Sequence, residues 1–123
     1  MYLHFQWHIT NLAFFAFIGQ TLYVTDFNLH AVIQIDVPTL QFFPIIPPGS
    51  LYRPSGLVVD AAGNLIVADS RNNALKVFSP QGQLLRLESS LNLIPSLNLP
   101  SDVALMRAGF LAVLDFNGRV TIF

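Results

Sequence analysis

The sequence has no cysteine and few charged residues. Without a thiol the chain cannot build a disulfide framework, a thiolate metal site or a cysteine nucleophile. The same absence favours a reducing compartment, so the expected location is the cytoplasm. Charged residues make up 11% of the chain and the net charge is −1, so no overall field draws it to nucleic acid or to an anionic membrane.

The N-terminal part lacks the features of a membrane segment. Its apolar run at residues 12–18 is far shorter than the about 20 apolar residues that a membrane-spanning helix needs. A signal peptide begins with positive charge, and residues 1–18 contain no Lys or Arg. We therefore expect no membrane association. Residues 1–18 are expected to form degenerate strands or to stand outside the natural fold.

Hydrophobic residues, in contrast, are abundant and make up 53% of the chain. This fraction excludes a disordered tail, because disorder goes with low hydrophobicity and high charge. A typical soluble domain has about 25% charged residues, well above the 11% of this chain. We therefore expect other protein to cover much of its surface.

The apolar residues recur in three copies of one unit. Residues 54–78 begin with Pro-Ser-Gly, residues 100–123 begin with Pro-Ser-Asp, and a partial earlier copy is visible at residues 22–35. The most regular polar position in the three copies is an aspartate, present as Asp26, Asp69 and Asp115. Self-similarity at a nearly constant spacing is the signature of a repeat fold.

Each unit reads as short apolar strands separated by turns. In the second copy the expected strands are residues 57–60, 65–68, 74–78 and 83–87, with Gly- or Pro-containing turns at residues 61–63 and 79–82. The leucine-rich stretch that follows is broken by Pro95 and is expected to join two units as a loop. Four short strands per unit are typical of a propeller blade. We predict an all-β fold, a partial β-propeller of about three four-stranded blades.

The second copy resembles the NHL repeat. Residues 54–60 read Pro-Ser-Gly-Leu-Val-Val-Asp, residues 63–70 read Gly-Asn-Leu-Ile-Val-Ala-Asp-Ser, and residues 73–78 read Asn-Ala-Leu-Lys-Val-Phe. The family pattern is roughly Pro-x-Gly-hydrophobic-x-hydrophobic-Asp, then Gly-Asn-hydrophobic-x-Val-x-Asp, then Asn-x-Arg-hydrophobic-x-hydrophobic-Phe. The chain departs from this pattern at the arginine, where it has Leu75. This departure removes positive charge from the blade.

The resemblance implies about half of a six-bladed NHL propeller. It divides the chain into a poorly matched N-terminal apolar segment (1–18), a degenerate NHL-like blade (19–50), an NHL repeat blade (51–98) and a C-terminal NHL-like blade (99–123). Half a ring leaves two apolar blade faces open, so missing blades or self-association are needed to close it. The chain resembles the C-terminal part of tripartite-motif NHL proteins, whose RING and B-box modules make the whole protein a ubiquitin ligase. Neither module is present in this sequence.

The repeated aspartates Asp26, Asp69 and Asp115 each end a strand and open a turn. One hypothesis is a ring of carboxylates that binds a cation in the central channel. The other is a structural turn, in which the side chain accepts hydrogen bonds from backbone N–H groups. Recurrence in every copy favours the structural turn, because chemistry seldom needs one carboxylate in every blade.

No catalytic or metal site is predicted. The imidazoles are His4, His8 and His30, and their spacing offers no third ligand for zinc. The sequence has no Gly-x-Ser-x-Gly nucleophile elbow and no phosphate-binding glycine loop. We therefore expect no cofactor, no metal and no enzyme activity from this chain.

Candidate binding residues gather on one predicted face. Because neighbouring strands run antiparallel, the turn after a blade's second strand and the loop that leads into the blade lie at the same end. The candidates at that end are Tyr52, Arg53, Arg71, Asn72, Phe27, Phe116 and Arg119. Arginine and aromatic residues are enriched where protein–protein binding energy concentrates, and they can also stack on unpaired RNA bases.

The leading functional hypothesis is therefore a non-catalytic module for protein–protein recognition, such as the substrate-recognition part of a RING-type ubiquitin ligase. One alternative is RNA binding through the Arg53/Arg71 face, although the chain offers little positive charge for it. The other alternative is a fragment of a propeller lyase or hydrolase.

Overall fold

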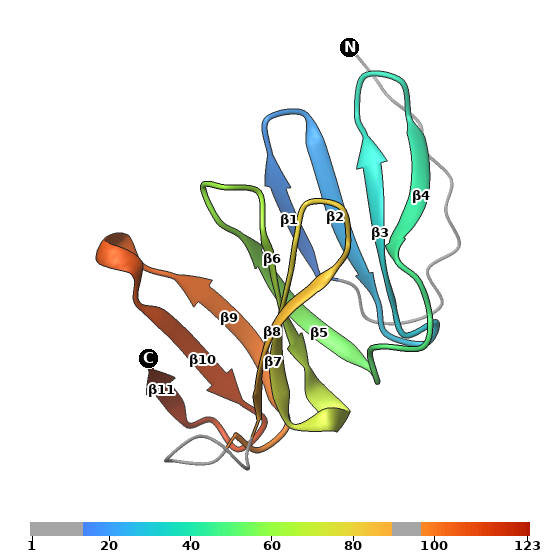
Figure 1. Ribbon diagram of the computed structural model, residues 1–123. Helices are drawn as coiled ribbons and strands as arrows, with labels where there is room; N and C mark the ends of the chain where they lie inside the picture. Colours follow the sequence, from blue (N-terminus) through green and yellow to red (C-terminus); the bar gives the residue numbers. More distant parts are fainter. Residues whose placement is uncertain (1–13, 90–96) are drawn as a thin grey trace.

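The computed structural model describes residues 14–89 and 97–123, which form three antiparallel β-sheets (Figure 1). The first sheet contains β1 (Phe15–Ile18), β2 (Thr21–Asp26), β3 (Ala31–Asp36) and β4 (Gln41–Ile46). The second contains β5 (Pro54–Val59), β6 (Leu65–Asp69), β7 (Ala74–Phe78) and β8 (Leu84–Ser89). The third contains β9 (Pro100–Leu105), β10 (Leu111–Asp115) and β11 (Val120–Ile122). Two short 3₁₀ helices, η1 (Ser70–Asn72) and η2 (Arg107–Gly109), lie in turns.

Within each sheet the strands pair in the order in which they follow one another along the chain. This meander is the arrangement of a propeller blade, and the prediction of an all-β partial β-propeller is confirmed. The first two blades have the predicted four strands. In the described residues the third blade has three strands, because β11 pairs with β10 and no further strand pairs with β11.

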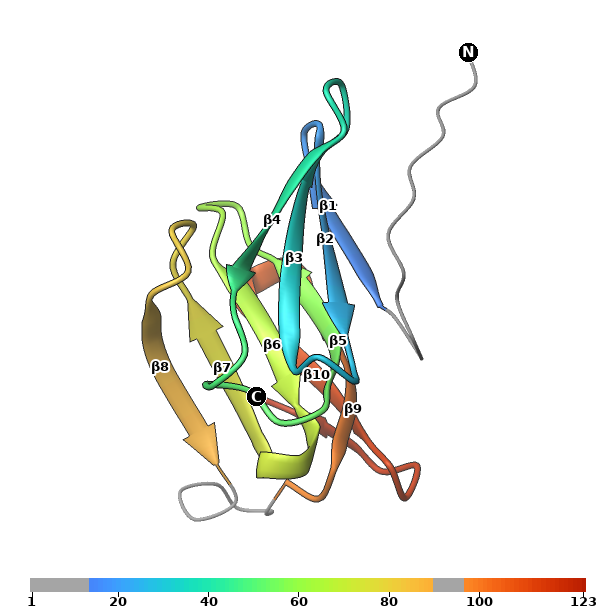
Figure 2. The same ribbon diagram turned by 90° about the vertical axis from the view of Figure 1, so that its right-hand side faces the viewer.

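The blades stack through their first strands. The inner strand β5 contacts β1 of the first blade and β9 of the third, and Figure 2 looks onto the first blade with the others behind it. Gly56 permits the close approach of β5 and β9. A Cβ atom at Gly56 would lie 2.7 Å from Cα of Asp102, so this position needs a residue without a side chain.

Two of the three apolar core clusters lie at the interfaces that separate the blades, and the third, Val24, Ala31, Ile33 and Ile35, lies within the first blade. Residues 65–69 of β6 are buried without the alternation of a half-exposed strand. The reason is that Leu65 and Val67 belong to one interface and Ile66 and Ala68 to the other. The interface of the first and second blades also buries Tyr23, Val32, Ile46, Leu51, Leu57 and Phe78. The interface of the second and third blades also buries Leu75, Leu97, Val103 and Val113.

Large apolar side chains are exposed on both ends of the row of blades. In the first blade Ala16 packs against the interface with the second blade, so the side chains of Phe15 and Phe17, its neighbours on the strand, point away from the second blade. Phe15 is 64% exposed and Phe17 is 76% exposed. In the third blade, Val120 and Ile122 are similarly exposed. Both ends therefore present apolar sheet surface of the kind that neighbouring blades cover.

The loops at the lower end of Figure 1 form one face, which we call the turn face. It consists of the turns at residues 27–30, 70–73 and 116–119 and the lead-in loops at residues 51–53 and 97–99. Backbone hydrogen bonds tie turn to lead-in loop: the N–H of Arg71 donates to Tyr52 O at 3.1 Å, and the N–H of Phe116 donates to Leu99 O at 3.0 Å. The predicted arrangement, with these loops at one end, is therefore present.

The strands lie close to their predicted positions, although β5 starts at Pro54 rather than at residue 57. Within residues 1–18, Phe15–Ile18 form β1, and residues 1–13 lie outside the described part of the chain. The predicted loop around Pro95 also lies outside it. In residues 14–89 and 97–123, no helix is long and apolar enough to cross a membrane.

Candidate binding site on the turn face

The carboxylate of Asp69 is fully buried at the end of β6 and satisfies three donors. Its Oδ1 accepts the backbone N–H of Tyr52 at 2.7 Å. Its Oδ2 accepts from Asn72 Nδ2 at 2.8 Å and pairs with the Lys76 ammonium at 2.7 Å. The side chain thus ties the lead-in loop of the second blade to the turn of the same blade, and Lys76 compensates the buried charge.

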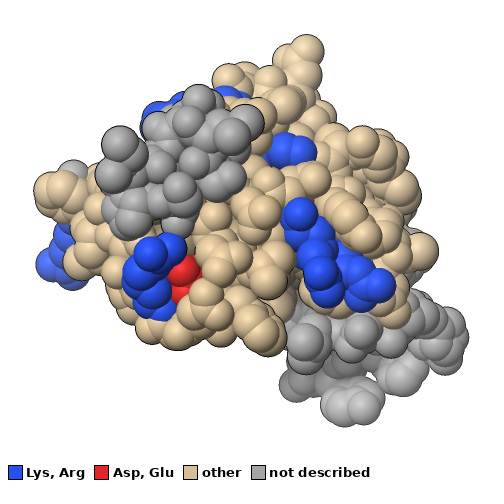
Figure 3. All heavy atoms as spheres, turned by 90° about the horizontal axis from the view of Figure 1, so that it is seen from below, with Lys and Arg blue, Asp and Glu red and all other residues tan. Residues whose placement is uncertain are grey.

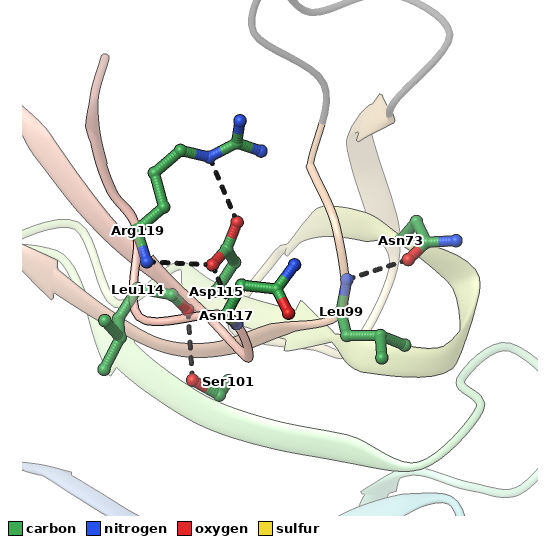
Figure 4. Close-up of polar contacts among 7 residues, drawn as sticks. All are labelled: Asn73, Leu99, Ser101, Leu114, Asp115, Asn117 and Arg119. Carbon is green, nitrogen blue, oxygen red and sulfur yellow. Dashed lines mark hydrogen bonds and ion pairs between the residues drawn. The ribbon is translucent and has the colours of Figure 1, made fainter.

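Asp115 has the corresponding place in the third blade (Figure 4). Its Oδ1 accepts the backbone N–H groups of Asn117 and Arg119, both at 3.0 Å. The Arg119 guanidinium pairs with Oδ2 at 3.2 Å. Two candidates from the sequence, Asn72 and Arg119, therefore have side chains that bind these carboxylates.

Asp26, in the first blade, is also fully buried. Its Oδ1 accepts the backbone N–H groups of Asn28 at 3.1 Å and Leu29 at 3.0 Å. Its Oδ2 is buried and has no hydrogen-bond partner among residues 14–89 and 97–123. Asp26 and Asp115 thus accept backbone N–H groups of their own turns, whereas Asp69 accepts the backbone N–H of Tyr52 in the lead-in loop and the side-chain amide of Asn72 in its turn. The structural-turn role stays a prediction to be tested by substitution.

One further hydrogen bond holds each blade to the next, and we call these two bonds the blade joints. Asn73 Oδ1 accepts the backbone N–H of Leu99 at 2.8 Å, and His30 Nδ1 accepts that of Arg53 at 2.8 Å. His30 and Asn73 each end a turn with a positive φ, 56° and 49°, a conformation that His and Asn adopt more readily than most residues. The joints were not among the contacts predicted from the sequence. The sequence feature that could have indicated them is that His30 and Asn73, both side-chain acceptors, occupy the same place in two copies.

A pocket of about 250 Å³ opens where the three blades meet on the turn face. Its lining residues are Phe14, Phe27, Ser55, Ser70, Arg71, Leu99, Ser101 and Phe116. Arg71 is exposed, and in the described part of the chain its guanidinium makes no hydrogen bond or ion pair. Phe116 is 76% exposed. The pocket therefore combines apolar walls with one unpaired positive charge.

Arg53 lies beside this pocket without lining it. Its guanidinium carbon is 4.9 Å from the centre of the Phe27 ring, a cation–π arrangement. The adjacent Tyr52 is 50% exposed and meets the His30 ring edge-to-face at 5.3 Å between centroids. Of the two arginines predicted for this face, Arg71 is thus the freer one.

The turn face is more basic than acidic. Among the atoms not drawn in grey, Figure 3 shows Lys and Arg at several places and little Asp or Glu surface. The reason is that the repeated aspartates are turned inward: Asp26 and Asp69 are fully buried and Asp115 is 5% exposed. The carboxylates thus organise the turns without presenting negative charge to a ligand.

The structure brings three of the sequence candidates, Phe27, Arg71 and Phe116, to one pocket. Ser55 and Ser101 also line the pocket and were not predicted, although Pro-Ser opens both the second and the third copy. The hydroxyl of Ser55 donates to Pro100 O at 3.0 Å, and that of Ser101 donates to Leu114 O at 3.1 Å (Figure 4). Because both hydroxyls donate to backbone carbonyls, the two serines help to hold neighbouring strands together.

In the described residues, no cluster of three or more His, Asp or Glu side chains could hold a metal ion. His4 and His8 lie outside the described residues. The side chain of His30 is used in a blade joint.

Comparison with known proteins gives one family match, since residues 51–78 match the family model of the NHL repeat. The protein wech of Drosophila melanogaster is 50% identical to this chain over 36 residues, which are 29% of this chain and 4% of wech. The chain thus spans a very small part of that relative.

Solved β-propeller structures resemble the chain over most of its length. A chain of a nidogen–laminin complex has a TM-score of 0.68 at 23% identity, with 89% of this chain and 42% of that chain covered. A luciferin-regenerating enzyme has a TM-score of 0.65 at 24% identity, with 88% and 38% covered. A virginiamycin B lyase from Staphylococcus aureus has a TM-score of 0.61 at 15% identity, with 84% and 37% covered. At these identities the likeness is one of fold, and it spans less than half of each solved chain.

Proposed function

Because the chain carries an NHL repeat within a partial β-propeller, we propose that it is a non-catalytic module that binds a protein partner through its turn face. The observation that supports this best is the pocket, whose lining combines Arg71 with the half-buried ring of Phe27 and the exposed ring of Phe116. Arginine and aromatic side chains next to a concave apolar surface are the usual centre of a protein-binding site. We place the protein in the cytoplasm.

The composition of the pocket argues against an enzyme, even though lyases and other enzymes share this fold. General acid–base catalysis needs a group that exchanges protons near neutral pH, usually His, Asp or Glu. None of the residues that line the pocket is of these types. Arg71 carries a permanent charge and suits binding better than proton transfer.

RNA binding through the Arg53/Arg71 face is the second candidate, supported by an arginine beside two aromatic rings. RNA affinity rises with the number of phosphates that the protein neutralises. Arg53 is held over Phe27 and Arg119 is paired with Asp115, which leaves Arg71 as the free cation at the pocket among the described residues. A protein ligand, held mainly by apolar contacts, therefore fits this surface better.

We further propose that the module acts within a larger protein, of which a RING-type ubiquitin ligase is the type suggested by the repeat. Additional blades of that protein or a second copy of this chain would cover the exposed end faces. This proposal rests on the exposed side chains of Phe17 and Val120, which are 76% and 59% exposed.

The test uses proximity labelling in cells with the full chain and charge-matched variants. Arg71→Glu, alone and with Arg53→Glu, should remove the protein partners that the wild type labels. Gln81→Glu with Gln83→Glu changes exposed residues on the opposite face and should keep them. Circular dichroism checks the fold of each variant. Loss of partners from the glutamine pair alone would contradict the proposal, and recovery of RNA with the wild type only would favour the second candidate.

A further inference from the structure

We propose that the pocket receives one large apolar side chain of an extended peptide, and that Arg71 binds an Asp or Glu next to it in the same peptide. This inference rests on the proposed function, since it names the chemistry that the protein partner would present. It specifies an acidic-apolar motif and assigns a separate role to each part of the pocket.

The size of the pocket limits what it can hold. Pockets for whole drug-sized ligands have volumes of about 300–1,000 Å³, and this pocket has about 250 Å³. Its walls include Phe14, Phe27, Leu99 and Phe116. A cavity of this volume with such walls fits a single aromatic or long aliphatic side chain, and burial of that side chain supplies most of the affinity.

The charge of the ligand follows from the charges at the pocket. Arg71 is the lining residue that carries a charge, and its guanidinium has no partner in the described part of the chain. The nearby carboxylates of Asp69 and Asp115 are buried and already bound by Lys76 and Arg119. A ligand carboxylate would therefore meet an unpaired guanidinium, with which it can form two parallel hydrogen bonds.

The backbone around the pocket indicates that the ligand's carboxylate comes from an acidic side chain rather than from a peptide C-terminus. Terminal carboxylates are usually captured by several free backbone N–H groups. Here the N–H of Arg71 donates to Tyr52 O and that of Phe116 donates to Leu99 O. The N–H of Leu99 donates to Asn73. With these donors occupied, the exposed Arg71 side chain remains to bind the charge.

The experiment selects ligands from a random 12-residue peptide library, displayed with both peptide ends fused, on the immobilised full chain. We expect enrichment of Phe, Trp, Tyr or Leu next to Asp or Glu. Arg71→Gln should weaken a selected peptide about 10-fold or more, as expected for a lost charge-assisted contact. Arg71→Glu should keep the apolar residue and exchange the neighbouring Asp or Glu for Lys or Arg. Gln81→Glu, on the opposite face, should leave the selection unchanged.

Four outcomes would overturn the inference. They are selection of basic motifs by the wild type, enrichment that does not change with Arg71, binding only of free peptides that end in an unblocked carboxylate, and tighter binding of a single-stranded RNA oligonucleotide than of any selected peptide. If the peptides fail while the Arg71→Glu variant still loses its cellular partners, the protein-binding function stands and only this ligand chemistry is wrong.

Discussion

The backbone N–H of Leu99, at the start of the third blade, donates to Oδ1 of Asn73, at the end of a turn in the second blade (Figure 4). His30 and Arg53 form the same bond between the first and second blades, also at 2.8 Å. Both donors, Arg53 and Leu99, have positive φ angles, 49° and 47°. Each joint thus fixes a loop in a backbone conformation that it would not adopt by itself.

Replacing Asn73 should show what one joint contributes. Asn73→Gly keeps the left-handed conformation but removes the acceptor, so it should lower the free energy of unfolding by about 1–3 kcal/mol, the cost of an unsatisfied buried group. Asn73→Asp keeps an acceptor oxygen and should cost less. Denaturant unfolding followed by circular dichroism measures both. Equal losses for the two variants would show that the hydrogen bond is not the stabilising element.

The buried aspartates should differ in their response to neutralisation. Asp69→Asn breaks the pair with Lys76 and should cost about 3 kcal/mol. Asp26→Asn keeps the Oδ1 acceptor and removes charge from an Oδ2 that has no partner, so its stability should be unchanged or higher. Thermal unfolding of both variants provides the comparison. If Asp26→Asn were the more damaging, Oδ2 would have a bound donor in solution.

Asp69→Ala should damage folding more than it damages ligand binding, because the side chain holds Tyr52 and Asn72 in place. The measurement is the unfolding midpoint of the variant alongside its binding of partner or cation. An unchanged midpoint with lost binding would show that the residue belongs to a ligand site instead.

Gly56→Ala should loosen the contact of the second and third blades. Its Cβ would lie 2.7 Å from Cα of Asp102, a contact with backbone that no side-chain rotation relieves. Gly109→Ala is the matched control, since nothing lies within 4 Å of a Cβ there and only its φ of 83° causes strain. We expect faster amide hydrogen exchange in β9 for Gly56→Ala and not for Gly109→Ala. Equal effects would mean that backbone strain, not the close approach, sets the requirement for glycine.

Stability should fall at high pH through Tyr23. Burial raises the pKa of the Tyr23 hydroxyl above its ordinary value of 10.0, so the folded state holds this proton more tightly than the unfolded state. The resulting stability is complete below about pH 10 and is lost as the pH rises through the folded-state pKa. Tyr23→Phe should therefore show a smaller loss of stability above pH 10 than the wild type. Parallel pH profiles for wild type and Tyr23→Phe would contradict this.

The isolated chain should not be a monodisperse monomer, because both end faces expose apolar sheet surface. Light scattering coupled to size-exclusion chromatography should detect dimers or larger species. Phe17→Ser together with Val120→Ser, which makes one position on each end face polar, should shift the distribution toward monomer. A wild-type monomer with a cooperative unfolding transition would refute the prediction.

The sequence predicted the fold because the repeat encodes it locally. The Pro-Ser openings, the apolar runs of β6 and β7 and the aspartates recur at matching places along the chain, so the repeat can be recognised without knowing how the blades pack. The division into blades at residues 19–50, 51–98 and 99–123 remains a prediction, as do the individual binding residues.

The site itself was harder to predict, because its contacts join different blades. Phe14 and Ser101 line the same pocket because of how the sheets stack. The spacing of residues within one copy does not predict that stacking. Nothing in the sequence distinguishes Arg53 from Arg71 as a binding residue. Only the structure shows that Phe27 holds one guanidinium and leaves the other open.

The joints give the molecule a direction. In each, the acceptor belongs to the blade that comes first in the chain and the donor to the one that follows. In the third blade the residue with positive φ in the matching turn is Gly118, at 83°, which has no side chain to offer. Any blade placed beyond it must be held without this bond. The outer face of the third blade is therefore the interface at which an assembled ring would open first, and at which one neighbouring blade could replace another.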